Sequence, residues 1–260
     1  MNFDLTDEQI MMRDGAERFV RDYAALERRR QRIARGEGFD AECWSQFADL
    51  GWLALPVPEE EGGLGGSMTD IALLLVELGR GMANEPIVSS AVLGAHLLAR
   101  SGWAARAEWI ERLVTGEQRV ALAHFETADQ ILKPELPATQ LRARAGSFRL
   151  SGSKLLIWDG DSADAFLVTA AREDGTPALV LVPADAAGLE IRAYPLIDGA
   201  RAADLSFDAV EINSAMIVAD GGTLYGSLEE AVDRARVASL ALAIGSIETC
   251  LDICADYLKV

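Results

Sequence analysis

Apolar residues follow three successive patterns along the chain. Up to residue 117 they recur at helical spacing, and from residue 118 to residue 222 they come in short runs separated by turn residues. From residue 223 they return to helical spacing. The patterns predict an α+β multidomain protein with an N-terminal all-α domain over 1–117 and a middle β-domain over 118–222. The first helix of a truncated C-terminal helical bundle follows over 223–260.

Local signals mark where helices of the first domain begin. Thr6 with Gln9 fits a capping box, and Asp40 is placed to cap a second helix. Ser67 with Asp70 opens a third helix. Its apolar residues keep the spacing of one buried face: Ile71, Leu74, Leu75, Leu78.

The middle region has no helix-length periodic segment between its apolar runs, so a parallel βαβ sheet is disfavoured. A compact antiparallel barrel or sandwich fits the short runs better. Ser151, Gly152 and Ser153 predict a tight turn between two of the strands.

The last segment predicts one long amphipathic helix. Ser227 with Glu230 fits a capping box. Apolar residues then repeat at alternating spacings of three and four: Val237, Leu240, Ile244, Ile247, Leu251, Cys254, Leu258. A single helix with such a stripe needs partners to bury it. Either the chain is a fragment or another subunit covers the stripe, and we favour the fragment.

Composition narrows the classes of function. Lys and Arg number 24 and Asp and Glu 41, which gives a net charge of −17. This excess of negative charge repels phosphate backbones and argues against general nucleic-acid binding. The acidic N-terminus, the lack of a long uninterrupted apolar run and three cysteines predict a cytoplasmic protein without a membrane segment. No metal site is expected, because Cys250 and Cys254 have no further ligand nearby.

Several strings in this order resemble the acyl-CoA dehydrogenase family over the whole chain. NFDLTDEQ resembles the family's first helix, and GWLALPVPEEEGGLGGS over 51–67 resembles its signature loop. DLSFDAVEI over 204–212 resembles the strand that leaves its β-domain, and ADYLKV the segment before its Arg-x-x-Phe-Gly motif. WDGDSADAFLV with YPLIDGARAADLSFDAV is most similar to the pimeloyl-CoA dehydrogenase small-subunit type.

The resemblance implies an FAD-dependent oxidation of an acyl-CoA thioester to the 2,3-enoyl-CoA. In this chemistry a carboxylate removes the proton next to the carbonyl, and a hydride leaves the next carbon for the flavin. The implied partners are the acyl-CoA substrate and an electron-transfer flavoprotein or similar acceptor. A homo- or hetero-tetramer is the implied assembly.

The resemblance also locates the catalytic base, which in the family is a Glu of the C-terminal bundle. Its first-helix location falls here on Ala235, followed by Arg236, and its other location lies beyond Val260. Alanine cannot accept a proton, so we expect no catalytic residue in this chain and no activity from these 260 residues alone. Arg236 and Ile131, near which the family's phosphate-contacting serine falls, are the candidate substrate-binding residues.

The family's flavin contacts fall on five residues of the predicted β-domain. Leu122, His124 and Phe125 lie on the strand that passes the isoalloxazine ring, largely through backbone groups. Leu156 stands where the family has a ring-stacking Trp, and Trp158 where it has a Thr that bonds the flavin. Trp158 either stacks on the flavin or is a core or interface tryptophan. His124 either polarises a carbonyl or is a hydrogen-bonded structural histidine.

Two alternatives remain open beside the dehydrogenase. Loss of the flavin-contacting Thr and Trp would suit a non-catalytic partner subunit that completes a heteromeric acyl-CoA dehydrogenase. A related flavin oxidase of the same fold is the other alternative.

Overall fold

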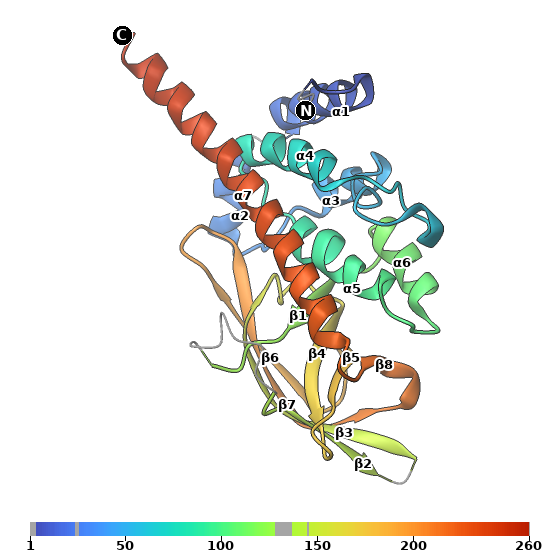
Figure 1. Ribbon diagram of the computed structural model, residues 1–260. Coiled ribbons are helices and arrows are strands. Elements are labelled where there is room, and N and C mark those ends of the chain that lie inside the picture. The colour runs from blue at the N-terminus through green and yellow to red at the C-terminus, as the bar shows by residue number, and fades with distance from the viewer. Residues whose placement is uncertain (1–3, 24–25, 128–136, 145, 260) are drawn as a thin grey trace.

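The computed structural model describes residues 4–23, 26–127, 137–144 and 146–259. A group of helices comes first, a β-sheet domain follows, and one long helix runs alongside both (Figure 1). The N-terminal elements are α1 (Asp7–Tyr23), α2 (Leu26–Arg35), α3 (Ala41–Asp49), η1 (Glu59–Glu61), α4 (Met68–Arg80), η2 (Ile87–Gly94), α5 (Ala95–Ala99) and α6 (Arg106–Val114). The elements after them are β1 (Val120–Ala123), β2 (Gln140–Arg144), β3 (Ser147–Trp158), β4 (Ala165–Arg172), β5 (Pro177–Pro183), β6 (Leu189–Pro195), β7 (Arg201–Ile212), η4 (Ser214–Met216), β8 (Ile217–Asp220) and α7 (Leu224–Tyr257).

The predicted helix starts of the first domain are confirmed. Thr6 Oγ1 accepts from the Gln9 amide at 3.2 Å, while Gln9 Oε1 accepts from the Thr6 amide at 3.0 Å. Ser67 and Asp70 form the same reciprocal capping box at the start of α4. The Asp40 carboxylate accepts two backbone amides of the first turn of α3. These signals need only neighbouring residues, so the sequence displays them completely.

The capping box predicted at Ser227 and Glu230 is wrong. The long helix begins at Leu224, and the Ser227 amide already donates to the Thr223 carbonyl at 3.3 Å. Ser227 therefore lies inside the first turn of α7, where its hydroxyl also faces the Thr223 carbonyl at 3.4 Å. Ser and Thr commonly form such a backward hydrogen bond within a helix, and the sequence does not distinguish it from a cap.

The described part of the β-domain forms one eight-stranded sheet in the order β6-β7-β3-β2-β4-β5-β8, with β1 also paired to β4. Most pairs are antiparallel, whereas β1 and β2 both run parallel to β4. The sheet is therefore mixed, and the predicted class of helical domain, β-domain and bundle helix is confirmed. Strand β4 is buried along nearly its whole length and forms the centre of the β-domain core.

The tight turn predicted at Ser151–Gly152–Ser153 is wrong, because β3 runs continuously through it. The pairing with β7 shifts register between Leu150 and Gly152, and Gly152 has φ +145°. A Cβ at Gly152 would lie 2.7 Å from the Thr139 hydroxyl oxygen. Gly152 therefore allows a β-bulge in β3 and a close approach of the Thr139 backbone, and it does not reverse the chain.

Helix α7 packs with its small residues, not with its large apolar stripe. The buried face of its middle section consists of Ala231, Ala235, Ala238, Ala241 and Gly245. Three of these alanines join the core of the N-terminal helices. The stripe remains exposed, at 64% for Leu240, 50% for Ile244 and 63% for Leu251. The last turns of α7 extend past the N-terminal helices (Figure 1).

By length and apolar composition alone, α7 also meets the criterion for a membrane-spanning helix. The same properties occur in a core helix of a bundle, and one face of α7 already packs on α4.

Candidate functional site

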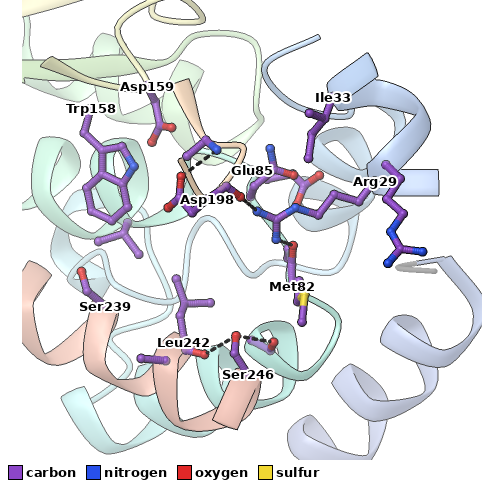
Figure 2. Close-up of a pocket in the computed structure, with 17 residues that line it drawn as sticks. Arg29, Ile33, Met82, Glu85, Trp158, Asp159, Asp198, Ser239, Leu242 and Ser246 are labelled. Atoms are coloured by element: carbon purple, nitrogen blue, oxygen red, sulfur yellow. Dashed lines mark hydrogen bonds between the residues drawn. The ribbon is translucent and has the colours of Figure 1, made fainter. Parts of the chain in front are cut away.

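A cavity of about 560 Å³ lies where four parts of the chain meet. Its walls come from α2, the segment between α4 and η2, the end of β3 with the β6–β7 turn, and the middle of α7 (Figure 2). The volume is within the range of small-molecule sites. Apolar walls are supplied by Ile33, Met82, Val88, Trp158, Leu242 and Ala243.

Arg29 holds two of these walls together. Its guanidinium donates to the Met82 carbonyl and, at 2.6 Å, to the Asp198 carbonyl. Burial lowers the pKa of Arg29, while Asp198 and Glu85 oppose this shift. Arg29 thereby joins α2 both to the residues after α4 and to the turn between β6 and β7 (Figure 2).

Buried ion pairs of Arg32 stabilise the part of the cavity wall that contains α2 and Glu85. Arg32 lies 3.1 Å from Glu85 and 3.4 Å from Asp40, and all three side chains are almost completely buried. Glu85 lines the cavity but its charge is already compensated by Arg32.

Asp159 directs its carboxyl group into the cavity from just beyond the end of β3 (Figure 2). The hydroxyl of buried Ser89 donates to Asp159 Oδ2 at 2.6 Å. Burial, helped by the nearby carboxylates of Asp161, Glu85 and Asp198, raises the pKa of Asp159 to about 7 against the hydrogen bond from Ser89. At neutral pH this group exists in both protonation states, so it can accept or donate a hydrogen bond.

Two large apolar side chains stay exposed at this end of β3. Leu156 is 46% and Trp158 39% exposed, and Trp158 lines the cavity. Leu156 has φ +52° and lies within a register irregularity of β3, where its amide donates to Asp204 Oδ1 at 3.1 Å. The preceding residue, Leu155, donates its amide to the Phe125 carbonyl at 2.8 Å. This bond attaches the segment after β1, which holds Phe125, to β3 directly beside Leu156.

His124 turns away from the cavity into a buried polar cluster. Lys154, with no exposed side-chain surface, lies 2.7 Å from Glu126 Oε1 and donates to the Thr169 hydroxyl at 3.0 Å. His124 Nδ1 lies 3.0 Å from the same hydroxyl. Because the ammonium can only donate, it occupies a lone pair of the Thr169 oxygen, and the hydroxyl proton is left able to donate to His124 Nδ1. Burial, followed by the Lys154 charge, lowers the pKa of His124 to about 4.

Glu126 ties together the two ends of the segment that follows β1. Its carboxylate accepts the amides of Ala138 at 2.6 Å and Thr139 at 2.9 Å, besides the ammonium of Lys154. Burial lowers the pKa of Lys154 to about 8 although Glu126 opposes the shift, so the pair is ionised at neutral pH. Burial alone would raise the pKa of Glu126, but Lys154 and the bonds to Thr139 outweigh it and hold that pKa below its usual value.

The other predicted residues lie away from the cavity. Leu122 is half-buried and packs against a hydrophobic cluster that includes Val120, Leu167 and Leu181. Arg236 is exposed on α7 and pairs with Asp233 at 2.6 Å, and neither lines the cavity. Ala235, at the first-helix base position, is buried in the core of the N-terminal helices. Ile131 lies outside the described residues.

The sequence did not point to Asp159, Ser89 or Arg29. Asp159 precedes a glycine at a strand end and is typical of a turn residue, and Arg29 belongs to an arginine-rich helix with few apolar residues. Only the packing of α2, η2 and the β3 end around one cavity brings them together. A carboxylate directly after a tryptophan in the resembling string WDGDSADAFLV was the one available signal.

Residues 6–117 match the family described as acyl-CoA dehydrogenase, N-terminal domain. Acyl-CoA dehydrogenase FadE27 of Mycobacterium tuberculosis is 30% identical over 85% of this chain and 57% of its own length. The chain spans between 57% and 70% of the length of the curated relatives that it matches.

Solved structures agree with the sequence matches. The ChsE4–ChsE5 complex from Mycobacterium tuberculosis superposes with a TM-score of 0.84 at 26% identity, over 99% of this chain and 68% of that chain. A glutaryl-CoA dehydrogenase from Mycobacterium smegmatis in complex with FADH2 shares the fold at 22% identity, with a TM-score of 0.84. It matches over 97% of this chain and 66% of its own.

Proposed function

Because the chain belongs to the acyl-CoA dehydrogenase family, we propose that it is part of an FAD-dependent acyl-CoA dehydrogenase subunit that oxidises an acyl-CoA thioester to the 2,3-enoyl-CoA. The observation that carries this proposal is the cavity between η2, the β3 end and α7, which combines apolar walls with exposed Trp158, while Leu156 is exposed two residues earlier on β3. An acyl group would lie in this cavity with its reacting carbons toward these two residues.

The residues at the β3 end fit the ring system of FAD. A folded protein normally covers large apolar side chains, yet Leu156 and Trp158 remain substantially exposed two residues apart. A planar ring laid over them would remove this apolar surface from water. Leu156 and Trp158 would therefore hold the ring by stacking, beside the backbone of Phe125. When bound, FAD supplies the acceptor for the hydride that leaves the acyl group.

The chain's own residues would bind and orient the acyl group and keep water away from it. Val88, Leu242 and Ala243 surround the acyl group with apolar surface, which favours a desolvated reaction site. Arg29 keeps α2 and the β6–β7 turn in place through its two carbonyl contacts. Proton removal needs a carboxylate. Ala235 cannot supply it, so the proposal assigns the base to a residue outside this chain.

A second candidate function is a non-catalytic partner subunit of a heteromeric dehydrogenase. Two observations favour it: Leu156 and Trp158 replace the Trp and Thr expected at the flavin, and a similar solved structure is the ChsE4–ChsE5 complex. Such a subunit would complete its partner's site without its own turnover. Under either function we propose a cytoplasmic tetramer. For the active form we propose an electron-transfer flavoprotein as the electron acceptor. A flavin oxidase of the same fold would pass its electrons to oxygen instead.

Flavin retention by the full-length protein tests the proposal. The protein is purified alone and co-expressed with each neighbouring dehydrogenase gene, and its visible flavin absorbance and acyl-CoA-dependent reduction of ferrocenium are measured. Bound flavin and turnover by the protein alone support the autonomous dehydrogenase. A colourless protein that gains flavin only with a partner supports the partner subunit. Turnover with oxygen in place of ferrocenium supports the oxidase.

A further inference from the structure

The backbone around Asp159 is held rigidly, so its carboxyl group has a defined position at the cavity. Asp159 has φ +56°, a left-handed conformation that Asp adopts more readily than most residues. Its amide donates to the Arg201 carbonyl at 3.0 Å, and its carbonyl accepts from the Ser162 amide at 3.1 Å. Both sides of the residue are thereby fixed to the sheet and to the following turn.

Only one of the two oxygens of the Asp159 carboxyl group takes a hydrogen bond among the described residues. Ser89 occupies Oδ2, while Oδ1 takes no hydrogen bond within the part of the chain that the structure describes. Among the described residues no cation pairs with Asp159: Arg29 is committed to the two backbone carbonyls, and Arg32 to Glu85 and Asp40. Oδ1 is therefore free to meet a group that enters the cavity.

A carboxyl group in this position is costly unless a ligand uses it. Asp159 is partly buried and its Oδ1 is still reachable from the cavity, so the carboxyl loses part of its hydration, and an apolar residue at this position would avoid that cost. The surrounding walls of Val88, Trp158 and Leu242 are apolar and would suit an unsubstituted alkyl chain without Asp159. Polar groups placed singly in apolar pockets set orientation and specificity.

We propose that the acyl group bound in this cavity carries a hydroxyl, and that this hydroxyl donates a hydrogen bond to Asp159 Oδ1. The inference rests on the proposed function and names the substrate class of the same cavity. An ammonium group is disfavoured, because Arg29 and Arg30 line the same cavity. A terminal carboxylate is disfavoured at this point, because it would meet the carboxyl groups of Asp159 and Asp198.

A matched pair of ligands tests the proposal on the full-length protein. Alkyl-CoA thioethers lack the carbonyl that makes the adjacent proton acidic, so they report binding without turnover. One member of each pair ends in a hydroxyl and the other in a methyl group, over a series of chain lengths. Isothermal titration calorimetry is expected to give about tenfold tighter binding of the hydroxylated member at its best length, as for a hydrogen bond to a charged group.

Three variants separate the contribution of Asp159 from that of the cavity as a whole. Asp159→Ala should bind both members of the pair equally, and Asp159→Asn, which keeps the size of the side chain, should retain part of the preference. Ser239→Ala is the matched control, because Ser239 lines the same cavity but donates its hydroxyl to the Ala235 carbonyl at 2.7 Å. It should keep the full preference. Circular dichroism and melting curves verify that each variant folds.

The outcomes distinguish this inference from the proposed function. Equal affinity of the unaltered protein for both thioethers overturns the inference and leaves the acyl-CoA site standing. A preference that survives in Asp159→Ala likewise overturns it. Binding of neither thioether overturns the inference together with the proposed function.

Discussion

Gly79 of α4 and Gly245 of α7 bring the backbones of their two helices into direct contact. A Cβ at Gly79 would lie 2.1 Å from the Leu242 carbonyl oxygen, and a Cβ at Gly245 would lie 1.9 Å from the Val76 carbonyl oxygen. The Ser246 hydroxyl, next to Gly245, donates to the Gly79 carbonyl at 3.0 Å. The crossing of α4 and α7 therefore leaves no room for any side chain at either glycine.

We expect Gly245→Ala to destabilise the protein by about 2 kcal/mol or more, because the added methyl group overlaps main-chain atoms that cannot rotate away. The free energy of unfolding in urea measures this. Gly226→Ala is the control in the same helix: no atom lies within 4 Å of its added Cβ. Alanine is the better helix former, so this variant should gain about 0.5–1 kcal/mol. Equal effects of the two substitutions would show that the crossing is not as tight as described.

Lys154→Met should cost roughly 3–5 kcal/mol, because it leaves the buried carboxylate of Glu126 without its cation. Adding Glu126→Gln should recover part of this loss, since the glutamine carbonyl can still accept one of the amides of Ala138 and Thr139. A double-mutant cycle on the free energy of unfolding measures the coupling between the two residues. Strict additivity of the two substitutions would contradict the ion pair.

His124 should make the folded protein sensitive to acid. Burial and then Lys154 lower its pKa from 6.5 to about 4, so the folded state keeps the ring neutral where the unfolded chain is already protonated. The stability that it contributes is present above pH 6.5 and is lost as the pH falls toward 4, by about 3 kcal/mol in total. His124→Gln should flatten this part of the curve of unfolding free energy against pH. A ring NMR signal of His124 that titrates near pH 6.5 would refute the assignment.

Asp159 should make the folded protein less stable as the pH rises, which is opposite to the effect of His124. Its pKa is raised from 3.8 to about 7, chiefly by burial, so the folded state keeps a proton that the unfolded chain has lost. The associated stability is complete below pH 3.8 and is lost as the pH rises through about 7. Asp159→Asn should therefore be more stable than the unaltered protein at pH 8 and should lose that advantage at pH 4. Urea unfolding at both pH values measures the difference, and a difference independent of pH would count against the raised pKa.

The sequence predicted correctly those local features, such as the helix caps of the first domain, that depend only on neighbouring residues. Capping boxes such as Thr6 with Gln9 need only four consecutive residues and appear in the structure as predicted. Helix α2 was missed, because half of Leu26–Arg35 is arginine and its few apolar residues give only a weak signal in the sequence. The continuous β3 was missed at Gly152, where a bulge and a turn have the same local composition.

Most of the candidate site depends on contacts between distant segments. The resemblance selected Leu156 and Trp158, and both lie exposed at one end of β3, with Trp158 on the cavity wall. It also selected His124, whose side chain turns inward to Thr169, 45 positions away in the chain. Asp159 with Ser89 joins residues 70 positions apart, and nothing in either local sequence indicates the contact.

The small-residue face of α7 has a consequence for synthesis on the ribosome. Ala235, Ala238 and Ala241 complete the same hydrophobic core as Phe47 and Leu78. Domains near the N-terminus usually fold first as a chain emerges. Here the first helices complete their core only when α7 is available, and Leu167 and Leu181 of the sheet share a further cluster with Leu224 and Leu228 of α7. A ribosome that pauses before α7 has emerged would expose both unfinished surfaces to chaperones and proteases.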